Sequence, residues 1–526
     1  MDHSFYRWIG RVAGLGAALA GVAAWAAEMP QLTPAAGSAI SLQTVLEATL
    51  LGQPDLLLKR ADVESKSGAL QAADGAFDVT LSGKGSVERT NTLLALADAS
   101  STNRRTGGDK YIAEAGVGKK WRSGVQTDGT WTTTRLDEKI RPNRDNTVQS
   151  DVTFKVTVPL GKGREDSTIA AEEGAKADLE AAKLRLRHAA ATNIQVAVAA
   201  YWDYLEAWIK VKVQQEAEDK SRKLLEETRA LIAGGEKPAA ESTQLEANLA
   251  DKVGTRLQAE QGFYASAHAL GKAVGMPYDS MTILPPPADP FPKPDKGLSR
   301  QLPELKPLLE RALTLRADHL ALKQDLDSAS AALKGAQEGM LPQVDLEMKV
   351  VHSGLMDNPS NAWETGVANN PNGLAALGQL TGKWPWGNNA ARGNLLSKQA
   401  AWEQKRVAWV ESSRTIRSAV TVALRELASA ALSLEQTSHS AEMYRQAIAN
   451  EQEKLRLGMA TLLDVMTTED KLISAMIKQA ADNSRYAKAL VKLRLESGTL
   501  ATPVAEGEYR VGREEILQLP PMDGPS

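Results

Sequence analysis

The chain has 526 residues with a formal net charge of only −3, which argues against a surface for nucleic acid or another polyanion. Hydrophobic residues make up 43% but aromatic residues only 5%, so alanine carries much of the apolar content, as in closely packed long helices. The absence of cysteine excludes disulfides, thiolate chemistry and a cysteine-linked lipid anchor.

The N-terminus is typical of a secretory signal peptide. Arg7 and Arg11 precede an apolar run from Val12 to Trp25, and Ala24-Trp25-Ala26 forms a small-x-small cleavage site. The alternative, an uncleaved anchor, is disfavoured because the run has roughly 14 residues and a bilayer needs about 20. No later stretch approaches that length, so any membrane insertion would use alternating strands.

Leu42 to Asp74 keeps a helical pattern, and a period of two begins at Phe77, which predicts a helix followed by a strand. A second alternating run, Val148 to Leu160, has about the 9 to 11 residues of a membrane strand. Between them, residues 111–134 alternate on both sides of Gly124, which predicts an additional hairpin. Strands of a soluble sandwich would alternate in the same way, so this pattern leaves both readings open.

Asp166 to Ile232 contains no proline and repeats apolar residues at helical spacing. It predicts one helix of roughly 67 residues, about 100 Å long, which needs partners along its length. Gly234 and Gly235 then end the helix in a tight turn, and Ala240 to Val274 forms the return helix.

Leu284-Pro285-Pro286-Pro287 opens a segment that cannot continue a helix and predicts an extended linker. Beyond it the pattern recurs, and the expected elements are a helix over Pro303–Gly339, a strand over Val344–Val350, a weaker return strand near Leu380–Trp386, and long helices over Asn389–Leu457 and Thr461–Ser497. Ile416, Val420, Ala423 and Leu427 advance by four, three and four residues, the spacing of a coiled-coil seam.

These recurrences indicate two tandem copies of one unit. Asp62-Val63-Glu64-Ser65 matches Asp325-Leu326-Asp327-Ser328 at an offset of 325 − 62 = 263, whereas Ile194 matches Ile416 at 416 − 194 = 222. The first copy therefore carries the longer insert. The alternative, chance alignment of alanine-rich helices, does not explain the shared order of elements.

The predicted fold class is mainly α with a β portion: two tandem repeats of long α-helical coiled-coil hairpins plus β-strands. The expected domains are a signal peptide (1–26), an N-terminal extension (27–40), a first repeat (41–280, with barrel strands about 77–160 and a helical hairpin 166–274), a Pro-rich linker (281–302), a second repeat (303–502, with barrel strands about 343–386 and a hairpin 389–497) and a C-terminal tail (503–526). Interfacial aromatics are expected at Trp121, Trp131, Trp363, Trp384 and Trp386.

Four motifs resemble those of the TolC-like outer-membrane efflux protein family, the outer membrane factors. They are the tip Leu457-Gly458-Met459-Ala460-Thr461-Leu462-Leu463-Asp464-Val465 and the junctions Val158-Pro159-Leu160-Gly161-Lys162-Gly163-Arg164, Leu341-Pro342-Gln343-Val344 and Asn389-Ala390-Ala391-Arg392-Gly393. The resemblance covers residues 41 to 502. It implies a homotrimer in the outer membrane, in which the β portion is transmembrane, the strands contribute to a shared trimeric β-barrel, and the helices form a periplasmic channel.

The same resemblance implies functional residues at the helix tips. Asp464 would form an acidic ring at a pore constriction with Thr467 at the second ring position, although Asp464 could equally be a helix-start aspartate favoured by the helix dipole. Because helical hairpin tips far from the strands can dock another protein, adaptor-docking tips are expected at Gly234, Gly235, Arg456, Leu457, Gly458 and Met459. The alternative is that these segments are only turns, and for the first tip the two readings are equal. Leu455 and Ala460 stand where the family has its tyrosine and arginine gate residues.

No catalytic, cofactor or metal site is predicted. The six histidines are scattered, and the dinucleotide, phosphate-loop and G-x-S-x-G patterns are absent. We therefore expect a non-enzymatic, cofactor-free outer-membrane channel, with a large periplasmic portion, that serves an efflux pump or a type I secretion system through a periplasmic adaptor and an inner-membrane transporter. The alternative is a periplasmic coiled-coil adaptor or scaffold that never enters a bilayer.

Overall fold

The computed structural model describes residues 39–93, 105–138, 147–235, 240–277, 284–294, 303–357, 373–457, 459–505 and 508–520. The predicted signal peptide, most of the N-terminal extension, Trp363, Gly458, and parts of the linker and of the C-terminal tail lie outside the described residues. The chain divides into two compact units. The helical unit comprises Met1–Val63, Ala182–Ala321 and Val410–Ser526, and the strand unit comprises Glu64–Ala181 and Leu322–Trp409.

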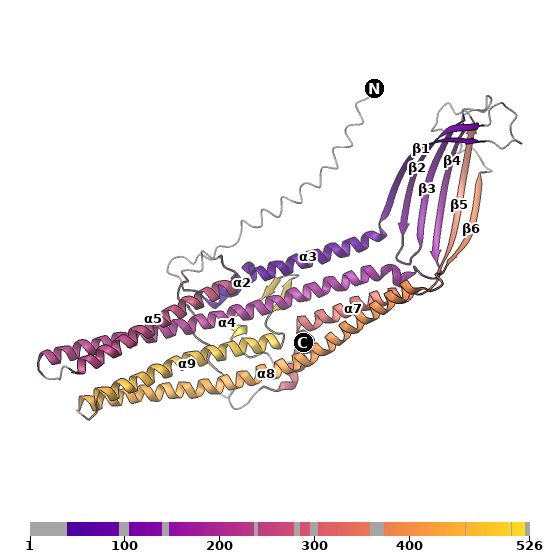
Figure 1. Cartoon of the computed structure of the whole chain (residues 1–526). Helices are drawn as coiled ribbons and strands as arrows, with labels where there is room; N and C mark the ends of the chain where they lie inside the picture. Colours follow the sequence, from indigo (N-terminus) through magenta and orange to yellow (C-terminus); the bar gives the residue numbers. More distant parts are fainter. Residues whose placement is uncertain are drawn as a thin grey trace, which may run out of the picture. The chain divides into compact units, whose positions relative to one another are not determined.

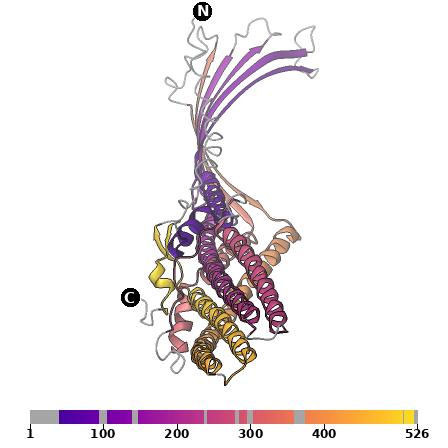
Figure 2. The same ribbon diagram turned by 90° about the vertical axis from the view of Figure 1, so that its left-hand side faces the viewer.

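The strand unit contains one six-stranded antiparallel sheet whose strands follow chain order (Figure 1). The strands are β1 (Val79–Leu93), β2 (Arg105–Lys120), β3 (Gln126–Glu138), β4 (Thr147–Pro159), β5 (Gln343–Asp357) and β6 (Leu374–Lys383). The hairpin predicted around Gly124 is present as β2 and β3, and Gly124 takes the positive φ of 85° that their turn requires. In Figure 2 the strands curve together along their length.

Two predicted strand boundaries were wrong by two or three residues. Residues 75–77 form a short 3₁₀ turn, so the first strand begins at Val79 rather than at Phe77. The return strand near Leu380–Trp386 is β6, which ends at Lys383. Lys383 pairs with Gln343, the first residue of β5, so Trp384 and Trp386 have no strand partner to extend the ladder.

The long helices are α4 (Glu165–Ala233), α5 (Ala240–Val274), α8 (Asn389–Arg456) and α9 (Leu462–Glu496). Within the helical unit, α4 runs antiparallel to α5, and α8 runs antiparallel to α9 (Figure 2). The chain ends with the short elements β7 (Thr502–Ala505), β8 (Glu508–Arg510) and α10 (Arg513–Ile516). The described residues thus confirm a mainly helical fold with one β portion.

Each copy was expected to begin with one shorter helix, and each of these two helices is broken once. Leu42–Gly52 is α2 and Pro54–Asp74 is α3, while Leu305–Leu315 is α6 and Ala317–Glu338 is α7. The break residues are Gln53 (φ −71°, ψ 119°) and Arg316 (φ −65°, ψ 118°), which are 316 − 53 = 263 residues apart, the repeat offset. Pro54 disfavours helical backbone at Gln53. Arg316 instead pairs with Asp318 and with Glu496 on α9.

A left-handed glycine ends each return helix against one of these breaks. Gly275 has φ 82° after α5, and a Cβ added there would lie 2.5 Å from the Gly52 carbonyl oxygen and 2.8 Å from Gln53 Cα. Gly498 has φ 74° after α9, and its Cβ would lie 2.9 Å from the Arg316 nitrogen. Both positions therefore need glycine for conformation and for space.

Three fully buried aromatic residues of α4, Tyr201, Trp202 and Tyr204, form the centre of the core of the helical unit. The Tyr204 hydroxyl donates to the carbonyls of Leu284 and Pro285, both at 3.1 Å, and burial raises the pKa of Tyr204 to about 12. Tyr201 donates to Asp289 at 2.9 Å. The described part of the linker is thereby fixed to α4 by hydrogen bonds.

We predict that Gly275→Ala lowers the free energy of unfolding by more than the 1–2 kcal/mol or so that a left-handed backbone costs an alanine, because the new Cβ also meets the α2 backbone. Gly235 supplies the control, since it has φ 76° but nothing within 4 Å of an added Cβ. Denaturant unfolding in detergent, followed by circular dichroism, compares the two variants. Equal losses for Gly275→Ala and Gly235→Ala would contradict the close packing at this break.

Candidate functional site

The sheet has one apolar and one polar face, because directly paired residues share a face and each strand alternates. The apolar face comprises Val79, Leu81, Val87, Tyr111, Ala113, Ala115, Val117, Trp131, Val152, Phe154, Val156, Leu346, Met348, Val350, Leu374 and Leu380. The polar face comprises Lys84, Glu88, Lys110, Glu114, Asp128, Thr130, Thr132, Asp151, Thr153, Lys155, Glu347 and Lys349.

The apolar face is open to its surroundings. Leu81 is 84% exposed, Phe154 54% and Trp131 42%, whereas Thr132 and Thr153 on the polar face are half-buried. A sheet in water would bury its apolar side, so a face of this composition fits lipid or another protein.

The extent of the apolar face matches a bilayer. It runs from Val79 to Val87 along β1, about the 9 to 11 residues of a membrane strand. Beyond Val87 the same face becomes charged, since Arg89 donates to both carboxylate oxygens of Asp109, at 2.6 and 3.1 Å. The expected interfacial aromatics Trp121, Trp384 and Trp386 follow the strand ends near the helices and are about half or fully exposed.

Both edges of the sheet are unpaired within the part of the chain that the structure describes. β1 pairs only with β2, and β6 only with β5. Such edges promote pairing with another chain. Because all neighbours are antiparallel, β1 and β6 run in opposite directions, so β6 of one copy can pair antiparallel with β1 of the next.

The strand-to-helix junction of the strand unit is held by the last residue of α7. The carboxylate of Glu338 accepts hydrogen bonds from the backbone nitrogens of Arg164 and Ser167, both at 2.5 Å, at the start of α4. A Cβ on Gly161 would lie 2.0 Å from the Pro342 carbonyl oxygen, so the two junction motifs touch through backbone. Sequence reasoning found these motifs but not the carboxylate cap.

The β2–β3 turn is tied to α4 by a buried carboxylate. Arg122 donates to Glu172 at 2.8 Å, and Lys176 also binds it. These hydrogen bonds lower the pKa of Glu172 to about 2. Their contribution to stability is therefore complete above the ordinary pKa of the carboxyl and is lost only as pH falls through about 2.

Helix α8 carries apolar residues on two opposite faces in the helical unit. The predicted seam of Ile416, Val420, Ala423 and Leu427 is buried. Val410, Val422, Leu432 and Met443 are 42–54% exposed, and at about 100° per residue they centre on the opposite side of the helix. We call these four residues the outer stripe. Its helical spacing could have been recognised in the sequence but was missed.

At the second tip, Asp464 caps α9. Thr461 is the N-cap, as predicted, and its nitrogen and hydroxyl donate to Asp464 at 2.9 and 2.6 Å. These hydrogen bonds hold the pKa of Asp464 below its usual range. The capping contribution is thus present above the ordinary pKa and is lost as pH falls through the lowered one. The helix-start role weighed for this residue is realised, while Thr467 lies exposed one turn further on.

The tip residues expected to dock a partner are at the surface wherever they are described. Gly234 and Gly235 end α4, and Arg456 donates to Glu453 at 2.8 Å. Leu457 is 59% exposed and Met459 69%, and Leu463, which sequence reasoning did not select, is 55% exposed. Leu457, Met459 and Leu463 make an exposed apolar group at the second tip, and Gly458 lies outside the described residues.

Two ion pairs near the tips join the copies within the helical unit. Lys252 on α5 binds Asp470 on α9, and Lys220 on α4 lies 3.4 Å from Glu469. The sequence gives no signal for them, because each joins residues more than 200 positions apart.

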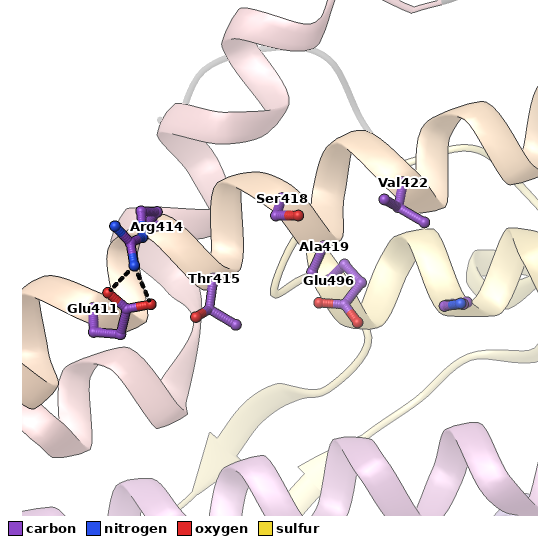
Figure 3. Close-up of a pocket in the computed structure, with 8 residues that line it drawn as sticks. Glu411, Arg414, Thr415, Ser418, Ala419, Val422 and Glu496 are labelled. Atoms are coloured by element: carbon purple, nitrogen blue, oxygen red, sulfur yellow. Dashed lines mark hydrogen bonds and ion pairs between the residues drawn. The ribbon is translucent and has the colours of Figure 1, made fainter.

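A shallow hollow of about 600 Å³ lies between α8 and the end of α9 (Figure 3). Its charged residues already have partners: Glu411 binds Arg414 at 2.9 Å, Lys492 binds Glu426 at 2.8 Å, and Glu496 binds Arg316. Val422 of the outer stripe is part of its lining. The hollow thus offers a packing surface with paired charges.

Among the described residues, no group of three or more histidine, cysteine or acidic side chains could hold a metal ion. Over the same part of the chain, no helix contains a stretch that is both long enough and apolar enough to cross a membrane.

No protein-family model matches the chain, and no curated protein matches it. Solved structures do. The CmeC outer membrane channel of Campylobacter jejuni is 14% identical with a TM-score of 0.62, and the match covers 87% of this chain and 85% of that one. The outer membrane protein VceC of Vibrio cholerae is 15% identical with a TM-score of 0.60, and the match covers 87% of this chain and 96% of that one. The open state of the Neisseria gonorrhoeae MtrE channel is also 15% identical, with a TM-score of 0.59, and the match covers 87% of this chain and 88% of that one. The chain therefore has the fold of outer-membrane channels, as the motif resemblance predicted.

Proposed function

We propose that this chain is a protomer of an outer-membrane channel of the TolC-like family, which gives cargo a passive exit from an efflux pump or a type I secretion system. The observation that carries the proposal is the two-faced sheet, whose apolar side is exposed over a bilayer-sized band. The sheet would lie in the outer membrane, and the long helices would extend into the periplasm. Energy would come from the inner-membrane transporter, because the proposed channel is passive.

The active form would be a homotrimer. One sheet leaves two edges unpaired, and unpaired backbone groups are costly in lipid, so a ring of copies joined β6 to β1 would satisfy both edges. The outer stripe of α8 supplies a second apolar contact for a neighbouring copy. The number three comes from the family resemblance.

The second candidate is a periplasmic coiled-coil adaptor that stays in solution. The paired long helices fit it equally well. The exposed apolar face of the sheet disfavours it, because a soluble protein would have to cover that face.

We predict that the mature protein is extracted from the outer-membrane fraction only by detergent and runs as a heat-modifiable trimer in gel electrophoresis. Phe154→Asp places a charge in the centre of the apolar face and should reduce membrane-inserted trimer severalfold, because a charge there faces lipid. Thr153→Asp, the neighbour on the polar face, is the matched control and should assemble. A soluble monomeric wild-type protein would end the channel proposal.

The second tip would also form the constriction of the channel. Asp464 and Thr467 are proposed to line it, and the Lys252–Asp470 and Lys220–Glu469 pairs would hold the second-copy hairpin against the first-copy helices. Loss of these pairs would favour a wider tip.

The double variant Glu469→Gln, Asp470→Asn should raise single-channel conductance in planar bilayers by about two- to thirtyfold, because two exposed ion pairs would together stabilise the closed state by about 0.4–2 kcal/mol. Glu442→Gln, which removes the Arg445–Glu442 pair on α8, is the control and should leave conductance unchanged. Asp464→Asn should change block by divalent cations at the tip. If the double variant and Asp464→Asn both behave like the wild type, the constriction lies elsewhere.

The tips are further proposed to dock a periplasmic adaptor, with Leu457, Met459 and Leu463 as the apolar contact of the second tip. We expect Met459→Glu to reduce co-purification of the adaptor–transporter complex from native cells about tenfold, with trimer yield unchanged. Met459→Leu keeps the apolar contact and should bind normally. Normal binding by the glutamate variant would remove this tip from the docking surface.

A further inference from the structure

The first copy contributes twice as many strands to the sheet as the second. β1 to β4 come from the first copy, and β5 and β6 from the second. The repeat offset falls by 263 − 222 = 41 residues across this region, so an inserted segment in the first copy accounts for the difference. The insert corresponds to the β2–β3 hairpin, without which β1 and β4 would be neighbours.

This hairpin is fully integrated into the sheet. β2 pairs with β1 from Val79 to Leu93, and β3 pairs with β4 from Gln126 to Leu136. At its turn, Arg122 binds Glu172 and lies 4.8 Å from the centre of the Phe77 ring. A Cβ on Gly124 would lie 2.1 Å from the Gly163 carbonyl oxygen, so the turn contacts the strand-to-helix junction directly.

The hairpin also follows the alternation of apolar and polar faces seen in β1 and β4. Ala115 and Trp131 lie on the apolar face at the level of Val152 of β4. On the polar face Lys84 lies opposite Glu114, and Lys155 lies 3.3 Å from Asp128. A hairpin folded outside the membrane would not need an exposed apolar side in register with its neighbours.

We propose that the β2–β3 hairpin is an additional segment of the barrel wall, so that three copies close a barrel of 3 × 6, about 18, strands with a wide lumen. The proposal rests on the proposed function for the trimer. With strands about 4.8 Å apart and tilted by about 40°, the backbone diameter is about 36 Å, against about 24 Å for four strands per copy.

The lumen of this barrel would accept bulky cargo without strong selection for charge. Barrels of 16 to 18 or so strands leave an open aqueous channel. Among the described side chains, the polar face carries lysines at positions 84, 110, 120, 155, 349 and 383 and acidic residues at positions 88, 114, 128, 151, 345 and 347, so the two signs of charge balance. Large solutes and polypeptide segments are thus the cargo class that the barrel section admits, with the tips as the narrower filter.

Single-cysteine variants test the wall directly, because the chain has no cysteine of its own. In membranes, Ala115→Cys on the apolar face of the hairpin should react only with a lipid-soluble maleimide. Thr132→Cys on its polar face should react with a membrane-impermeant maleimide. Val152→Cys and Thr153→Cys supply the same pair of positions on β4 as controls.

A second variant tests the width of the barrel. It lacks residues 94–146 and joins β1 to β4 by a four-residue turn. It also carries Glu172→Gln, which neutralises the carboxylate that loses its partner Arg122. Electron-microscopic projections of the purified trimer should show the barrel diameter reduced by about one third. If this variant does not assemble, the cysteine labelling of the intact chain still decides.

The outcomes separate the two proposals. If the β4 cysteines react as expected but both hairpin cysteines react with the impermeant maleimide, the hairpin is not part of the barrel wall. The channel proposal would then still stand. Equal barrel diameters before and after the deletion would also overturn it. Aqueous labelling at all four positions would overturn the channel itself.

Discussion

The structure depends on two requirements of the sheet. The backbone donors and acceptors of its edge strands need hydrogen-bond partners, and its apolar face needs to be shielded from water. Hydrogen bonds join all six strands in order, but β1 and β6 each keep one row of donors and acceptors without a strand partner in the described chain. In lipid such a row costs far more than in water, because no solvent replaces the missing partner. The same environment stabilises side chains such as Leu81 and Phe154, which water would disfavour. In the proposed channel, membrane insertion and self-association would therefore together cover the apolar face and pair the backbone groups of both edge strands.

In the helical unit, the long helices are held at fixed positions by a packing contact that occurs once in each copy. The left-handed glycine at the end of the return helix packs against a helix break: Gly275 against the break at Gln53, and Gly498 against the break at Arg316. The backbone contact is so close that a side chain on the glycine would prevent it. The two copies preserve the geometry although only one of the breaks is followed by proline, so tertiary contact rather than local sequence maintains it.

Local patterns predicted much of this fold, and the failures have physical causes. Alternation around Gly124 and the proline-free run before Gly234 are local signals, and they predicted the hairpin and the long helix α4. At its break Arg316 pairs with Glu496, 180 residues away, and no local pattern reports such a contact. The tip ion pair of Lys252 with Asp470 is equally remote in sequence. The helical spacing of the outer stripe is visible in the sequence of α8. It was not predicted as a surface, because the buried seam alone accounts for the formation of the helix.

The tip illustrates how one residue can serve both the protomer and the assembly. In a three-fold ring, neighbouring Asp464 carboxylates would repel and raise one another's pKa values. The hydrogen bonds from Thr461 act in the opposite direction, because they favour the charged form. Repulsion between solvent-exposed charges weakens beyond about 8 Å at physiological ionic strength, whereas the cap is a direct contact that salt screens little. In a ring wider than this distance Asp464 would therefore remain ionised, and its cap would fix the start of α9 at the proposed constriction.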